Sequence, residues 1–226
     1  MLIEYIATTV DDAILIEESG ADRIELVSAL TEGGLTPSYG LIEAVARRVG
    51  IPVNVMVRPH SQSFVYSGYD LEIMKNDIKA IRSLGANGVV LGVLNDQNEI
   101  DTAAMESLLL ECTGMEVTFH RAIEGTSNPI QSAKILSDYK EITSILTSGG
   151  TGDLDSRLAT MLEMKEEAGH IAILAGGGLT KQNINHVHSK VNTGHYHFGT
   201  AIRKNNSPVE GIDLKRAKEI VKLLKG

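Results

Sequence analysis

The sequence has almost no thiol chemistry available to it. Among its 226 residues there is one cysteine, Cys112, and no tryptophan. A single thiol excludes an internal disulfide and any zinc cluster held by several thiolates, and it fits a reducing compartment. Apolar residues at helical spacing surround Cys112, so we expect this thiol to pack in the core. We therefore expect a cytoplasmic protein.

Long hydrophobic runs and an excess of positive charge are also missing. The longest apolar stretches, such as Gly88–Leu94, have the length of a strand and fall far below the roughly 20 residues that span a bilayer. The opening stretch Met1–Thr9 contains Glu4 and no basic segment, which predicts a first strand and not a signal peptide. The formal net charge is -8, with scattered basic residues. We expect neither a membrane nor a nucleic-acid partner.

What the sequence does contain is a regular alternation of short apolar runs and longer amphipathic ones. The expected strands are Leu2–Ala7, Arg23–Val27, Val53–Val57, Gly88–Val93, Glu116–His120, Ser144–Thr147, Ile171–Ala175 and Tyr196–Gly199. The expected helices are Val10–Ser19, Tyr39–Val49, Leu71–Leu84, Thr102–Cys112, Pro129–Tyr139, Leu154–Ala168, Gln182–Ser189 and Leu214–Leu224.

Eight strand-helix units in this length predict one particular fold. Alternating units imply parallel pairing with right-handed crossovers, and eight of them usually close into a barrel. An open dinucleotide-binding sheet would carry a glycine-rich turn after its first strand, whereas this chain has Ala7–Val10 there. The sequence therefore predicts an α/β protein made of a single (β/α)8 TIM barrel spanning residues 1–226.

Four polar side chains are candidates for catalysis. Glu4 and Glu25 lie in the middle of aliphatic strands, while Arg58 and His120 each lie at the end of a strand. Active sites of TIM barrels are built at the carboxyl ends of the strands, and such a group could perform acid-base work on a small anion. Inward glutamates can equally form a buried salt-bridge layer with Arg23 or Arg58, and both interpretations stay open.

Glycine-rich turns follow the last three strands. The candidate anion-binding residues in them are Ser148, Gly149, Gly176, Gly177, Gly199 and Thr200. Glycine lets backbone N–H groups approach an oxyanion, and the last loops of TIM barrels commonly hold phosphate. The alternative is that these glycines only permit tight turns. A further loop, Glu32–Ser38, is either a cap over the barrel mouth or a turn with a helix N-cap.

Two pairs of histidines have close spacing along the chain. His195 and His197 stand two apart on one strand and so share a face, a spacing that can chelate. No carboxylate or thiolate lies near them in sequence, which favours a solvated strand start over a metal site and leaves any metal ligands unknown. His186 and His188 lie in a helical window and are expected at the surface.

Several motifs along the chain carry a resemblance to a known family. They are Gly20–Leu26, Glu32–Ser38, Val57–Pro59, Phe64–Ser67, Val117–Ala122, Leu146–Gly150 and Ala175–Gly178. In this order the chain resembles the copper homeostasis protein CutC family throughout its length. The resemblance implies a cytoplasmic TIM barrel that binds copper through thiols and forms a homo-oligomer.

The sequence departs from that family where copper ligation is proposed. Family members for which copper ligation is proposed have cysteines near the end of the first strand and just after the glutamate-leucine pair of the second strand. This chain has Ala7, Thr8 and Val27 at those places. Copper as a cofactor or partner thus rests on the resemblance alone. Two hypotheses follow: a copper-handling protein, or a barrel enzyme acting on a small anionic or phosphorylated metabolite with His120 and Glu25 as acid-base groups.

Overall fold

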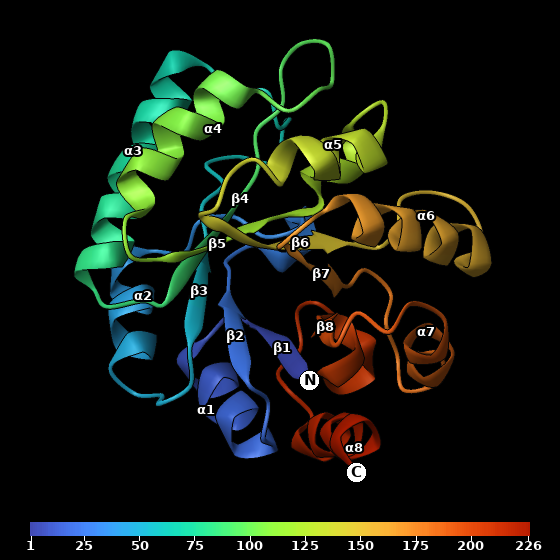
Figure 1. The fold of residues 1–226 in the computed structure, drawn as a ribbon. Helices are drawn as coiled ribbons and strands as arrows, with labels where there is room; N and C mark the ends of the chain where they lie inside the picture. Colours follow the sequence, from blue (N-terminus) through green and yellow to red (C-terminus); the bar gives the residue numbers. More distant parts are fainter.

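Eight parallel strands pair in sequence order, and the first strand pairs with the last. The computed structural model describes residues 1–226, and its strands form a closed barrel in the order β1 to β8. Helices surround the barrel on its outer side, and the two chain ends lie on the same side of the molecule, near α8 (Figure 1). The predicted (β/α)8 fold is confirmed.

The strands are short. They are β1 (Leu2–Ala7), β2 (Arg23–Leu26), β3 (Val53–Met56), β4 (Gly88–Leu91), β5 (Glu116–Phe119), β6 (Ile142–Thr147), β7 (Ala172–Ala175) and β8 (His195–Phe198). The helices are α1 (Val10–Ser19), α2 (Tyr39–Ala46), α3 (Gly68–Ser83), α4 (Thr102–Leu109), α5 (Pro129–Leu136), α6 (Leu154–Glu167), α7 (Ile184–Val191) and α8 (Leu214–Lys225). Short 3-10 helices lie between some of them.

The expected boundaries differ from the observed ones mainly at element ends. Strand β4 ends at Leu91 and not at Val93, because the chain leaves the ladder once its partners end. Helix α4 ends at Leu109, and residues 110–112 tighten into a 3-10 turn. Helix α7 begins two residues later than expected, because Thr180 and Asn183 bond each other's backbone in a preceding turn.

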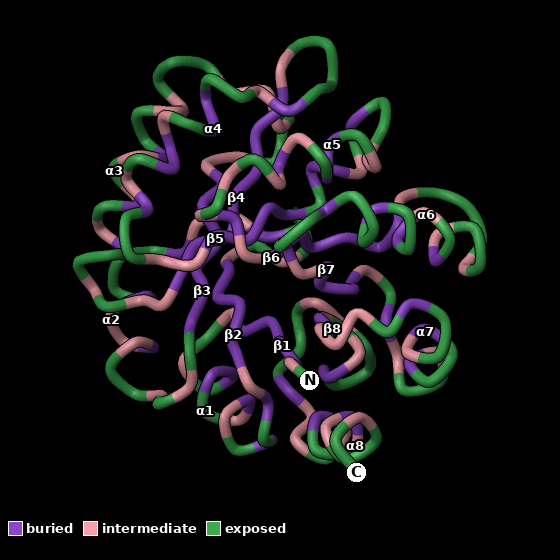
Figure 2. Tube along the Cα trace, in the orientation of Figure 1, coloured by how far each residue is buried: buried purple, intermediate pink, exposed green.

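The apolar core lies mainly outside the barrel, between strands and helices. A cluster of 51 buried residues fills this layer, and the strands and inner helix faces are accordingly buried while outer helix faces are exposed (Figure 2). Cys112 belongs to this cluster and is 1% exposed, which confirms its predicted core packing. Inside the barrel the apolar cluster has only four members, Ile6, Val27, Met56 and Val90.

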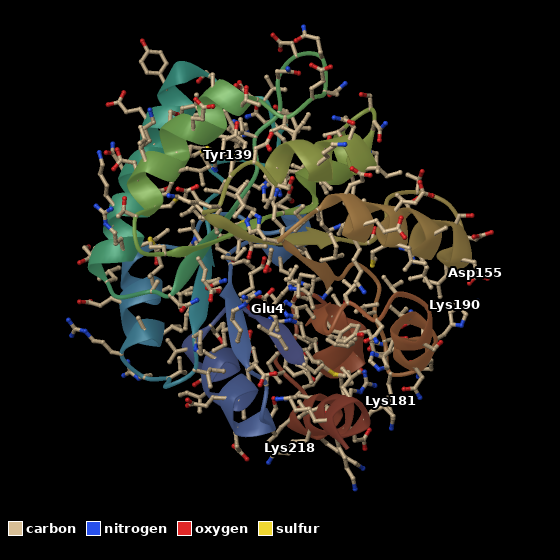
Figure 3. The ribbon with its side chains drawn as sticks, viewed as in Figure 1. Glu4, Tyr139, Asp155, Lys181, Lys190 and Lys218 are labelled. Carbon is tan, nitrogen blue, oxygen red and sulfur yellow. The ribbon has the colours of Figure 1, made fainter.

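A column of charged side chains occupies much of the barrel interior. Strand alternation aims Glu4 of β1 and Arg23 of β2 inward, and the two strands are paired at these residues. Arg23 Nε donates to Glu4 Oε2 at 2.5 Å, and its Nη1 donates to Glu116 Oε2 of β5 at 3.0 Å. Glu4 lies at the centre of the molecule (Figure 3) and is fully buried. The salt-bridge interpretation therefore holds for Glu4.

The protonation state of Glu4 follows from these contacts. Burial by itself would raise the pKa of this carboxyl, but the Arg23 guanidinium and the hydrogen bond with His197 hold it at about 2. Glu4 is thus charged at neutral pH, and its charge is matched inside the barrel by that of Arg23.

We predict that Arg23→Met destabilises the fold by about 3–5 kcal/mol, because it leaves the Glu4 charge buried without its cation. Arg47→Met is the matched control, since Arg47 pairs with Glu43 on the surface and its side chain is 75% exposed. That change should cost no more than about 0.5 kcal/mol. Urea unfolding at neutral pH measures the free energy of unfolding of both variants. Equal decreases in this free energy would contradict the predicted role of the buried Glu4–Arg23 pair.

Candidate functional site

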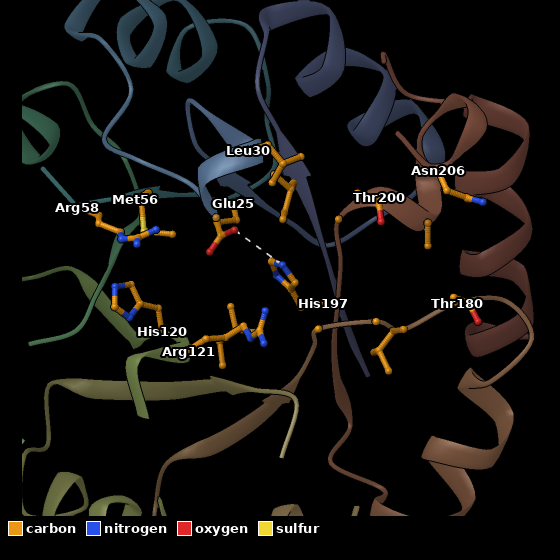
Figure 4. Close-up of a pocket in the computed structure, with 18 of the residues that line it drawn as sticks. Glu25, Leu30, Met56, Arg58, His120, Arg121, Thr180, His197, Thr200 and Asn206 are labelled. Carbon is orange, nitrogen blue, oxygen red and sulfur yellow. Dashed lines mark ion pairs between the residues drawn. The ribbon is translucent and has the colours of Figure 1, made fainter. Parts of the chain in front are cut away.

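A cavity of about 420 Å³ opens at the carboxyl ends of the strands, the face on which TIM barrels carry their active sites. The charged or titratable side chains that line it are Glu25, Arg58, His120, Arg121 and His197. In Figure 4 these side chains point toward one shared space, with Glu25 and His197 joined by an ion pair. The cavity is the candidate functional site.

Glu25 is a buried carboxyl with a free oxygen. It projects inward from β2, is 2% exposed, and its Oε1 has no hydrogen-bond partner. Its Oε2 lies 3.8 Å from Nε2 of His197. Burial raises the pKa of Glu25 to about 7, although the nearby His197 acts in the opposite direction. Glu25 can therefore gain or lose a proton near neutral pH.

His197 is held in one orientation by a carboxylate behind it. Its Nδ1 lies 2.7 Å from Oε1 of Glu4, so the carboxylate favours a proton on Nδ1 and leaves Nε2 facing Glu25. Burial alone would lower the pKa of His197, but the two glutamates outweigh it and raise that pKa. Glu4 does not line the cavity, and it orients a residue that does.

The solvated strand start predicted for His195 and His197 is wrong for His197. His197 is 5% exposed, and two carboxylates lie beside it. The carboxylates come from β1, which pairs with β8 only because the barrel closes, and from β2, the next strand after β1. His195 is half-buried at the opposite end of β8. Of the helical histidines, His186 is exposed as expected.

Glu4, Glu25 and His197 form a group that could hold a metal ion. One ligand atom from each lies within 4.8 Å of the other two. Carboxylate oxygen and imidazole nitrogen suit Cu(II), whereas Cu(I) prefers thiolate and thioether sulfur. Since Glu4 is already engaged by Arg23 and His197, the donors that remain are the Glu25 carboxylate and His197 Nε2.

Arg58 is used largely to hold a loop. Its Nη1 donates to the carbonyl oxygens of Glu32 at 2.8 Å and Gly34 at 3.2 Å, and its guanidinium lies over the Phe64 ring. Its Nε is buried without a partner. The loop so held lines the cavity through Gly33, and its end caps α2. The Glu32–Ser38 segment therefore contributes both to the wall of the barrel mouth and to the N-cap of α2.

His120 accepts a hydrogen bond and keeps an N–H without a partner. Its Nδ1 accepts from the backbone N–H of Ala122 at 3.2 Å, so its proton is on Nε2, which is buried and unpartnered. Burial and, to a smaller extent, the Arg58 charge lower the pKa of His120 to about 3. A neutral ring with its lone pair already engaged is poorly suited to accept a proton. The histidine beside Glu25 is His197.

The glycine-rich turns contribute unequally. Gly177, Gly199 and Thr200 line the cavity. Ser148, Gly149 and Gly176 do not, and the Ser148 N–H donates to Glu124 Oε1 at 2.6 Å. The Glu124 carboxylate also pairs with Arg121. The Ser148 N–H was expected to bind an external anion, but it donates to this carboxylate of the chain itself.

Gly149 has a packing role. Its φ is +84°, and a Cβ built there would lie 2.0 Å from the carbonyl oxygen of Arg157 in α6. Only glycine allows this approach of the loop to the helix.

None of the helices is both long enough and apolar enough to cross a membrane.

Comparison with known proteins gives a consistent family. A family model described as the CutC family matches residues 1–202. A family protein named CutC from Erwinia tasmaniensis is 40% identical over 182 residues, which are 80% of this chain and 72% of the relative. The copper homeostasis protein cutC homolog of Homo sapiens is 38% identical over 187 residues, 82% of this chain and 68% of the relative.

Solved structures agree with the sequence relatives. A crystal structure of a CutC protein from Streptococcus agalactiae has a TM-score of 0.83 and 32% identity, covering 89% of this chain and 99% of its own. A phosphoribosylanthranilate isomerase from Thermotoga maritima, at 14% identity and a TM-score of 0.66, is similar in fold alone. On the family match and these relatives, the chain belongs to the CutC family.

Proposed function

We propose that this chain acts in copper homeostasis and that it does so by holding a copper ion at the barrel mouth. Its human relative is named a copper homeostasis protein. One observation carries the proposal. Glu25 and His197 place a carboxylate oxygen and an imidazole nitrogen 3.8 Å apart, both buried, at the wall of an open cavity.

The donor set favours Cu(II) as the bound form. The one thiol of the chain, Cys112, is buried in the outer core and donates to the Leu108 carbonyl at 3.3 Å. Burial raises the pKa of this thiol to about 12, so the thiolate that copper requires does not form at neutral pH. Oxygen and nitrogen donors at the mouth are instead the ligands of a Cu(II) site.

Glu4 would support such a site from behind. Metal-ligating histidines usually donate their second N–H to a carboxylate, which fixes the tautomer and makes the other nitrogen a better ligand. The 2.7 Å contact between His197 Nδ1 and Glu4 Oε1 has this form, and Arg23 fixes Glu4 in turn. The proposal also includes a cytoplasmic location and self-association, and both stay predictions.

We expect Cu(II) to bind in a 1:1 complex that involves Glu25 and His197. Glu25→Gln or His197→Gln removes one donor from a small set and should weaken binding at least about tenfold. Cys112→Ser is the matched control, because its thiol is remote from the mouth, and it should bind like the wild type. Competition with a chromophoric chelator measures the affinities. Loss of binding in Cys112→Ser alone would contradict the site.

Copper affinity should rise with pH. A ligand must lose its proton before it binds, and the pKa of Glu25 is about 7. Between pH 6 and pH 8 the deprotonated fraction of such a group grows about tenfold. His197, whose pKa is also raised, must lose a proton as well, so the apparent Cu(II) affinity should grow by at least that factor. Titrations at several pH values measure this slope. A flat profile would argue against Glu25 as a ligand.

A second candidate function is proton transfer on a small anionic or phosphorylated metabolite. Its support is the contact between Glu25 and His197 in a cavity large enough for a small ligand. The pKa of Glu25 is about 7, so this group can exchange a proton near neutral pH. In this function the pair moves the proton and His120 donates to a substrate oxygen. Such turnover would persist in chelator-treated protein, whereas a role in copper handling needs the ion.

A further inference from the structure

Two buried N–H groups at the cavity have no acceptor. Arg58 Nε and His120 Nε2 both lack a hydrogen-bond partner, and the residues are 8% and 4% exposed. Leaving a buried donor without an acceptor costs free energy, and the cost is larger when the group is charged. Both residues line the same cavity. A molecule in that cavity that supplies an acceptor would remove this cost.

Both donors are fixed before any ligand arrives. Arg58 is held by the carbonyl oxygens of Glu32 and Gly34, and His120 is held by the N–H of Ala122. The Phe64 ring contacts both, at 4.9 Å from the Arg58 guanidinium carbon and 5.0 Å from the centroid of the His120 ring. Binding would therefore require little ordering of these side chains.

The charge on this side of the cavity favours an anion. The hydrogen bonds of the Arg58 guanidinium go to carbonyl oxygens, so no carboxylate of the chain neutralises its charge. His120 is neutral and presents a donor. The other arginine of the cavity, Arg121, is paired with Glu124 through two hydrogen bonds. Arg58 is thus the cavity cation that still needs a counter-ion.

We propose that Arg58 Nε and His120 Nε2 form an oxyanion subsite that binds the carboxylate or phosphate end of a small metabolite. Arg58 and His120 lie together on one side of the cavity, with Glu25 and His197 across from them (Figure 4). Because Glu25 Oε1 is an unpartnered acceptor, the ligand has a hydrogen-bond donor such as a hydroxyl or amine at its other end. The two donors of the subsite are not copper ligands, so anion binding there requires no metal.

The test uses chelator-treated protein labelled with 15N in histidine and arginine, titrated with acetate and, separately, with inorganic phosphate. We expect the His120 Nε2–H resonance to shift saturably with at least one anion. A response to acetate assigns a carboxylate ligand, and a response to phosphate assigns a phosphorylated one. Absence of a saturable shift with both anions would overturn the proposal.

Two variants and a control make the test specific. Arg58→Lys keeps the positive charge but lacks the Nε–H, and it should weaken anion binding at least about tenfold. His120→Phe keeps a ring against Phe64 and removes the donor, and the Arg58 Nε–H signal then reports the weaker binding. Arg47→Lys, on the exposed surface, should bind like the wild type.

Wild-type affinity in both Arg58→Lys and His120→Phe would overturn the subsite. If one variant fails to fold, the other decides. Copper is absent throughout, and neither residue is a ligand in the copper proposal, so failure of one proposal leaves the other standing.

Discussion

The buried contact of Glu4 with Arg23 and His197 is the interaction on which the functional face depends. It joins β8, β1 and β2 across the seam where the barrel closes. Glu4 can remain charged inside the barrel because Arg23 is its partner, and the charge of Glu4 in turn sets the tautomer of His197. Nε2 of His197 then faces Glu25, whose pKa is raised toward neutrality by burial. The properties of the mouth thus begin with a pair that does not itself line it.

The cavity is divided between two kinds of chemistry. On one side, Glu25 and His197 offer an acceptor and a titratable pair. On the other, Arg58 and His120 offer donors that have no acceptor in the chain. A cation suits the first side and an anion suits the second, so copper and a small metabolite are compatible occupants of one mouth. In the proposed copper role, oxygen and nitrogen donors take the place of thiolates, which the mouth lacks.

The fold could be predicted because each strand-helix unit is recognisable from the spacing of its own apolar residues. The spacing of apolar residues is a property of neighbouring residues, and helix α1 begins and ends at the residues that this spacing predicted. The anion pocket was less predictable. The Ser148 N–H is taken by Glu124, a carboxylate 24 residues away in a short 3-10 segment that has no periodic signature. The role of His120 was also hidden, because its tautomer depends on the backbone N–H that it caps.

The sequence by itself determined the barrel, the inward direction of Glu4 and Glu25, and the shared face of His195 and His197, since all of these follow from local periodicity. Only the tertiary structure decided that His197 belongs with the glutamates. Glu4 and His197 are 193 residues apart, and they meet because β1 pairs with β8. Ring closure is a long-range event, and local spacing does not contain the identity of the neighbours that it brings together.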